Sequence, residues 1–181
     1  MSYPNAAQGL RLMFLGRMVM IAGLLVSWVP FVGSLLMIAS PVLELVGIYK
    51  AGDDDENYRG ALVFAALVLA ANFIAGLLGE GFLRFALEAA ASVLNLLMVY
   101  SVCTTTSNLL HSVGQEALSQ RGRDIIKIYT ACVAVSLVCT VLGVIPIVNI
   151  AAALVSGLSS LVLLAGYVMY LLFLNGSSKV L

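Results

Sequence analysis

Long apolar runs joined by connections of only a few residues are the feature that most constrains this chain. The stretch from Leu10 to Tyr49 is interrupted only at Val29-Pro30-Phe31. A helix that crosses the ~30 Å hydrocarbon core of a bilayer needs about 20 apolar residues, so this stretch is about two crossings long. Proline lacks an N–H and suits the first turn of a new helix. We therefore predict that the chain crosses a membrane, turns at Pro30 and crosses back.

Composition argues against a soluble fold. Hydrophobic residues make up 62% of the chain and charged residues 10%, whereas soluble domains contain roughly 45–50% and about 25%. A soluble domain of this size leaves too much surface in water to hide so many apolar side chains. The predicted fold class is an all-α integral membrane protein, and the lipid bilayer is its first expected partner.

The apolar runs predict six transmembrane helices within a single domain, residues 1–181. Very short turns at Pro30, at Gly79-Glu80-Gly81 and at Ile145-Pro146 would close three tight antiparallel hairpins. Each turn lies 19 to 21 residues before a tyrosine, a pattern that suggests an internal repeat, although any two apolar helices resemble each other to some degree. The six predicted spans are residues 10–29, 31–49, 58–78, 81–103, 125–144 and 147–174.

Two connections are polar. The acidic run Asp53–Glu56 is interpreted as a solvated loop, because its spacing does not match a calcium-binding loop. Residues 104–124 form a cytoplasmic polar segment that either extends the fourth helix or lies on the membrane surface as a short amphipathic helix. Asp124 stands where it would cap the fifth helix.

The positions of lysine and arginine predict the orientation. With six spans, eight of the nine basic residues fall on one side of the membrane and Arg84 falls on the other. Basic residues concentrate on the cytoplasmic side of membrane proteins. We therefore expect both termini in the cytoplasm, and the shortness of the loops favours a bacterial plasma membrane. The eight residues are Arg11, Arg17, Lys50, Arg59, Arg121, Arg123, Lys127 and Lys179.

Arg17 and Glu44 are the first pair of charges expected inside the membrane. Arg17 lies 13 residues before Pro30 and Glu44 lies 14 residues after it, so an antiparallel hairpin brings them to nearly equal depth. A charge near the centre of a bilayer costs on the order of 3 kcal/mol unless it is paired or hydrated. We predict a direct or water-bridged ion pair. It either fixes the register of the hairpin or contacts a solute, and the alternative is that both side chains snorkel to the surface.

A second group of charges begins the fourth span. Glu80, Arg84 and Glu88 follow the spacing i, i+4, i+8, which predicts one helix face. Such a stripe either lines a wet cavity or makes a contact between helices. Asn72 and Asn95 are further polar residues expected within spans.

Small residues at helical spacing predict close helix packing or a homo-oligomer interface. They lie in two of the predicted spans. These residues are Ala66, Ala70, Ala71, Ala75 and Gly76 in the third span and Gly157, Ser160 and Ala165 in the sixth.

Motifs of catalysis and of cofactor binding are absent from the sequence. It contains no phosphate-binding glycine loop, nucleophile elbow or paired metal-binding histidines, and three cysteines with one histidine do not make a zinc site. We therefore expect no cofactor, no metal, no catalytic residues and no nucleic-acid partner, and an enzymatic function is disfavoured although it stays open.

Three functions stay open. The first is a non-catalytic membrane protein that acts by association with itself or with a membrane-protein partner, as an accessory or scaffold subunit. The second is a small transporter or channel that uses Glu44, Glu88 and Arg17. The third is an enzyme acting on lipid near Glu80, Arg84 and Glu88, which the lack of a visible nucleophile–base pair disfavours.

Overall fold

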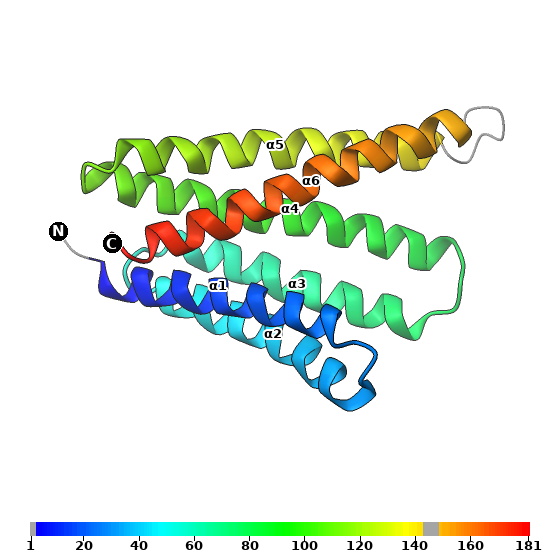
Figure 1. Cartoon of the computed structure of the whole chain (residues 1–181), viewed down its shortest axis with the longest axis horizontal. Helices are drawn as coiled ribbons and strands as arrows, with labels where there is room; N and C mark the ends of the chain where they lie inside the picture. Colours follow the sequence, from blue (N-terminus) through cyan, green and yellow to red (C-terminus); the bar gives the residue numbers. More distant parts are fainter. Residues whose placement is uncertain (1–2, 143–148) are drawn as a thin grey trace.

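The chain is all-helical in the part that its computed structural model describes, residues 3–142 and 149–181 (Figure 1). The predicted Ile145-Pro146 turn lies outside these residues. Pro30 begins the second helix, as its preference for a first helical turn predicts. The six helices are α1 (Pro4–Leu25), α2 (Pro30–Ala51), α3 (Tyr58–Leu77), α4 (Phe82–Ser112), α5 (Glu116–Leu142) and α6 (Asn149–Ser177).

Five of these helices are long and apolar enough to cross a membrane: α1, α2, α3, α4 and the Gly157–Ser177 part of α6. Their outward surface is apolar as well, with Phe31 85% exposed and Phe82 83% exposed. Large apolar side chains at that exposure are costly in water but suit a lipid environment, in which helices satisfy their own backbone hydrogen bonds. The expected class of helical membrane bundle agrees with this surface.

Helices that follow one another in the chain pack together. α1 packs mainly against α2, α3 against α4, and α5 against both α4 and α6, while α6 also touches α1. The two termini meet at one end of the bundle, where the backbone N–H of Tyr3 donates a hydrogen bond of 2.9 Å to the carbonyl oxygen of Leu181 (Figure 1). The connections α2–α3 and α4–α5 lie at that same end, and the α1–α2 and α3–α4 turns lie at the other.

Glycines allow α1 and α2 to approach very closely. Gly9, Gly16 and Gly23 recur every seven residues of α1 and are buried. A Cβ atom added at Gly16 would lie 2.9 Å from the carbonyl oxygen of Ser40, and one added at Gly47 would lie 2.6 Å from that of Gly9. Contacts this short exclude any side chain, so the backbones themselves form the interface, as in close helix pairs in lipid.

The polar segment 104–124 is helical for most of its length. α4 continues through it to Ser112, which confirms the extension of the fourth helix, and α5 begins already at Glu116. The turn between them contains Gly114, whose φ of 78° suits glycine. The prediction that Asp124 caps the fifth helix is wrong, because Asp124 lies inside α5. There it accepts a hydrogen bond of 3.0 Å from Lys127, which lowers the pKa of its carboxyl group.

The acidic run is more than a solvated loop. The carboxylate of Asp54 accepts hydrogen bonds from the Asn5 side-chain amide at 2.9 Å and from the Ala6 backbone N–H at 2.8 Å. The first N–H groups of a helix have no partner within the helix, and an anion there is favoured by the helix dipole. Asp54 therefore caps α1 from the α2–α3 connection, 48 positions away from Ala6.

Only some of the small residues that were predicted to form a packing face of α3 are buried. Ala71 and Ala75 are buried, as are Ala61 and Ala65, but the other three predicted members face outward. Those three are Ala66, Ala70 and Gly76. In α6 the close contact is made at Gly166, where an added Cβ would lie 3.1 Å from Ile128, whereas the predicted Gly157 has no atom within 4 Å of that position.

Candidate functional site

The predicted ion pair between Arg17 and Glu44 is confirmed. Arg17 donates from Nε and Nη2 to the same carboxylate oxygen, Oε1 of Glu44, at 2.9 Å and 2.5 Å. The two side chains are only 11% and 13% exposed. Pairing lowers the cost of holding two charges that are so little exposed, because each charge is the counter-ion of the other.

Two tyrosines of α6 complete the surroundings of Arg17. The guanidinium carbon lies 5.7 Å from the ring centre of Tyr167 and 6.0 Å from that of Tyr170. A cation above an aromatic face at this distance is stabilised by about 0.5–2 kcal/mol. Arg17 of α1 is therefore held by a carboxylate on α2 and by two rings on α6, so one side chain connects three helices.

Two cavities open on either side of this arginine. Cavity A, about 510 Å³, lies between α4, α5 and α6 and reaches Arg17 of α1. Cavity B, about 580 Å³, lies between α1, α2, α3 and α4 and reaches both members of the ion pair. Both volumes fall in the range of small-molecule sites. Four residues line both cavities, namely Arg17, Glu88, Ser92 and Asn95.

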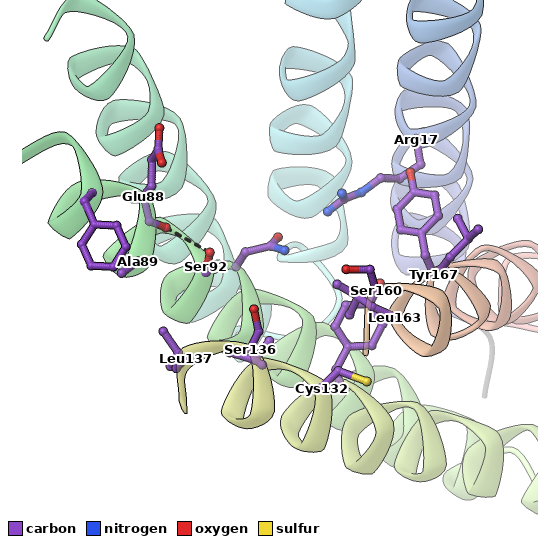
Figure 2. Close-up of a pocket in the computed structure, with 15 residues that line it drawn as sticks. Arg17, Glu88, Ala89, Ser92, Cys132, Ser136, Leu137, Ser160, Leu163 and Tyr167 are labelled. Carbon is purple, nitrogen blue, oxygen red and sulfur yellow. Dashed lines mark hydrogen bonds between the residues drawn. The ribbon is translucent and has the colours of Figure 1, made fainter. Parts of the chain in front are cut away.

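Charged and polar groups enter cavity A from different sides (Figure 2). Arg17 and Tyr167 stand on one side, and Glu88 and Ser92 stand on the other, with Ser136 of α5 along the floor. The hydroxyl of Ser92 donates a hydrogen bond of 3.0 Å to the backbone carbonyl of Glu88. Cavity A thus combines a few charged and polar groups with a larger apolar lining, the pattern of a site that orients a small ligand.

Asn72, which is exposed, and Asn95, which is half-buried, bring side-chain amides to the cavities. Neither amide makes a hydrogen bond within that part of the chain, yet Asn72 lines cavity B and Asn95 lines both cavities. An amide without a partner in an apolar medium costs several kcal/mol. Water or a polar solute in the cavities would satisfy both groups.

Pro41 adds a backbone acceptor to the wall of cavity B. α2 runs through this proline, which has no N–H to donate to the carbonyl of Met37 one turn earlier. Met37 and Pro41 both line cavity B, as does the buried Ser40. The carbonyl of Met37 therefore lacks its intrahelical bond beside this cavity.

The predicted stripe of Glu80, Arg84 and Glu88 is only partly formed. α4 begins at Phe82, so Glu80 belongs to the preceding turn and not to the helix face, and the prediction for that residue is wrong. Arg84 and Glu88 do pair, with Nε to Oε1 at 2.8 Å, and both are about half exposed. Of these three residues, Glu88 alone lines the two cavities, within the described part of the chain.

The structure therefore gathers five of the seven predicted polar residues around the two cavities. Arg17, Glu44, Asn72, Glu88 and Asn95 line the cavities, and Glu80 and Arg84 do not. Sequence reasoning missed Ser92, although it lies one helical turn after Glu88 and one before Asn95. It also missed the contact of Tyr167 and Tyr170 with Arg17, for which no local pattern exists because α1 and α6 lie at opposite ends of the chain.

The chain was compared with known proteins at the levels of family, sequence and structure. No protein-family model, curated protein sequence or solved structure matches it. Its function is therefore argued from the cavities and the charges that line them.

Proposed function

We propose that this chain is a small membrane transporter that binds a polar solute beside the Arg17–Glu44 pair. The observation that carries the proposal is that Arg17 and Glu88 line two cavities of about 510 and 580 Å³ that share one polar wall. Ionisable residues within membrane spans are costly, and they mark solute and ion pathways in many membrane proteins. The unpaired amides of Asn72 and Asn95 support a hydrated path in the same place.

The proposal includes the arrangement in the membrane. Six crossings form three antiparallel hairpins, with α5 as the crossing that is not among the five apolar helices. Both termini lie in the cytoplasm of a bacterial plasma membrane. The meeting of Tyr3 with Leu181 supports an even number of crossings, and the basic residues at that end support the orientation. The recurring distance from turn to tyrosine supports an internal repeat, an arrangement common in transporters.

Flux into proteoliposomes tests the proposed transport. The purified protein is reconstituted and offered a panel of radiolabelled amino acids, amines, carboxylates and polyols. We expect at least one solute to enter faster than into protein-free vesicles. Glu88→Gln should slow that entry about tenfold or more, because it removes a charged hydrogen-bonding group from both cavities.

Glu80→Gln is the matched control, since it makes the same chemical change in the turn before α4 and outside both cavities. It should leave the flux unchanged. Flux that survives both Glu88→Gln and Glu44→Gln, or the absence of flux for every solute in the panel, contradicts transport at this site.

Association is a second candidate, and one observation on α3 supports it. Ala66 and Ala70, one turn apart, face outward, and nothing lies within 4 Å of a Cβ built at Gly76. Outward small residues let a second helix approach closely in lipid. Oxidative cross-linking of Ala70→Cys, in a background without the three native cysteines, should give a covalent dimer, whereas the buried Ala71→Cys should not. Equal cross-linking at both positions contradicts a specific interface.

A further inference from the structure

Cavity A contains one cationic and one anionic side chain that are not paired with each other. Among the described residues, Arg17 and Glu88 are the charged groups that line it. Each is already neutralised by a partner outside cavity A: Arg17 by Glu44 and Glu88 by Arg84. Cavity A therefore offers a positive edge and a negative edge but carries no net charge.

The two charged side chains stand on opposite sides of the space. In Figure 2, Arg17 reaches in from α1 on one side and Glu88 stands on α4 at the other. Arg17 uses Nε and Nη2 for Glu44, which leaves the Nη1 group as the edge not bonded to that carboxylate. Glu88 uses Oε1 for Arg84, so Oε2 is the oxygen not engaged in that bond.

The presence of one positive and one negative edge, with no net charge, selects the ligand. A ligand with net charge would lose its hydration without a compensating counter-charge, and a buried unpaired charge costs several kcal/mol. A ligand that carries both signs meets both edges, and guanidinium and carboxylate groups are strong partners for an anionic oxygen group and an ammonium group. The hydroxyl of Ser92 and the amide of Asn95 lie on the same helix face as Glu88 and add neutral contacts.

We propose that cavity A binds a small zwitterion, with its anionic group at Arg17 and its primary ammonium at Glu88. The apolar part of the wall, which includes Phe85, Leu137 and Leu163, would receive an aliphatic portion of the ligand. This inference rests on the proposed function, because it names the class of solute that the site takes. A free amino acid and the headgroup of phosphatidylethanolamine share this chemistry.

A thermal-shift assay on the detergent-purified protein tests the class of ligand. L-leucine should raise Tm in a saturable way, because a ligand that binds only the folded state stabilises it. L-leucinamide lacks the carboxylate and 4-methylpentanoate lacks the ammonium, so each should raise Tm far less at equal concentration. A parallel comparison of nanodiscs made of phosphatidylethanolamine or phosphatidylcholine covers the lipid source.

Variants locate the binding. Glu88→Gln should weaken the binding of L-leucine about tenfold or more, Glu88→Asp should retain part of it, and Glu80→Gln should leave it unchanged. Because Glu88 is about half exposed, the ligand-free Tm of these variants should stay close to that of the parent protein, which checks that they fold.

The outcomes separate cleanly. A Tm rise with leucine supports a free amino acid, and a rise only in phosphatidylethanolamine nanodiscs supports the headgroup, provided that Glu88→Gln strongly reduces that rise. The zwitterion inference is overturned if neither leucine nor phosphatidylethanolamine raises Tm, or if the singly charged analogues raise Tm as much as leucine does. Transport is still supported after that result if the cavity is open to water. A dry cavity would contradict transport independently of the ligand.

Discussion

Arg17 connects three helices in the interior of this bundle. It joins Glu44 of α2 and stands over Tyr167 and Tyr170 of α6. A charge that is nearly buried is tolerated only when its partners are present, so the pair fixes how α1, α2 and α6 meet. At the same time Arg17 and Glu44 line cavity B, so the structural ion pair and the proposed solute site would use the same side chains.

At this scale we predict a strong asymmetry between single and double substitutions. Glu44→Gln should lower the free energy of unfolding by about 3 kcal/mol, because it leaves the guanidinium of Arg17 without its counter-charge. The double variant Arg17→Leu/Glu44→Leu should recover most of that loss, since no charge remains to be satisfied. The free energy of unfolding of the single and double variants is measured in SDS–detergent mixtures, with circular dichroism as the readout. Single and double variants with additive losses would contradict an energetically coupled pair.

The helices themselves were largely predictable from the sequence, and their rotation about their axes was not. The length of the apolar run predicted the end of α3 to within one residue, since the helix ends at residue 77 and the predicted span ends at residue 78. The Arg17–Glu44 pair was predicted because both residues lie at nearly the same distance from the turn at Pro30. By contrast, the buried face of α3 is set by contact with α4, so the sequence did not tell which of its small residues are buried, or that Ala66 and Ala70 face outward.

The same reason explains what was missed in the candidate site. Glu88, Ser92 and Asn95 share one face of α4 by helical spacing alone, but only the packing of the other helices around α4 turns that face into a wall of the two cavities. The capping of α1 by Asp54 likewise depends on where the α2–α3 connection lies in space. Local patterns carry no information on contacts of that range.

At the scale of a helix pair we predict that the glycines of α1 cannot be enlarged. Gly16→Ala should lower the free energy of unfolding by about 1–3 kcal/mol, because its Cβ would lie 2.9 Å from the carbonyl oxygen of Ser40. Gly76→Ala in α3 meets no atom within 4 Å and should be neutral or slightly stabilising, since alanine favours helix. The same unfolding assay serves for both variants. Equal effects at the two positions would show that backbone contact does not govern the α1–α2 interface.

The molecule as a whole is a bundle with both ends of the chain on one side. The hydrogen bond between Tyr3 and Leu181 joins the termini, and Lys179 and the first turns of α5 bring basic residues to the same end (Figure 1). A membrane protein in which the chain enters and leaves on one side crosses an even number of times. This geometry would leave the turns α1–α2 and α3–α4 on the opposite side.

Reporter fusions test that arrangement. Green fluorescent protein fused to either terminus should fluoresce in bacterial cells, and alkaline phosphatase at either terminus should be inactive, because both ends are expected in the cytoplasm. Alkaline phosphatase inserted at Gly79, in the α3–α4 turn, should be active and serves as the positive control. Termini that report opposite sides would exclude six crossings.

The central claim is that water reaches the charged wall between the two cavities, and cysteine labelling measures this most directly. In a background with Cys103, Cys132 and Cys139 replaced by alanine, single cysteines are placed at Ser92, which lines both cavities, and at its neighbour Val93, which lines neither. The protein is held in lipid vesicles and treated with a charged, membrane-impermeant methanethiosulfonate reagent. We predict that Ser92→Cys reacts and that Val93→Cys does not. A protected cysteine at position 92, in a protein that still elutes as a folded species, would contradict a water-filled site and with it the proposed transport.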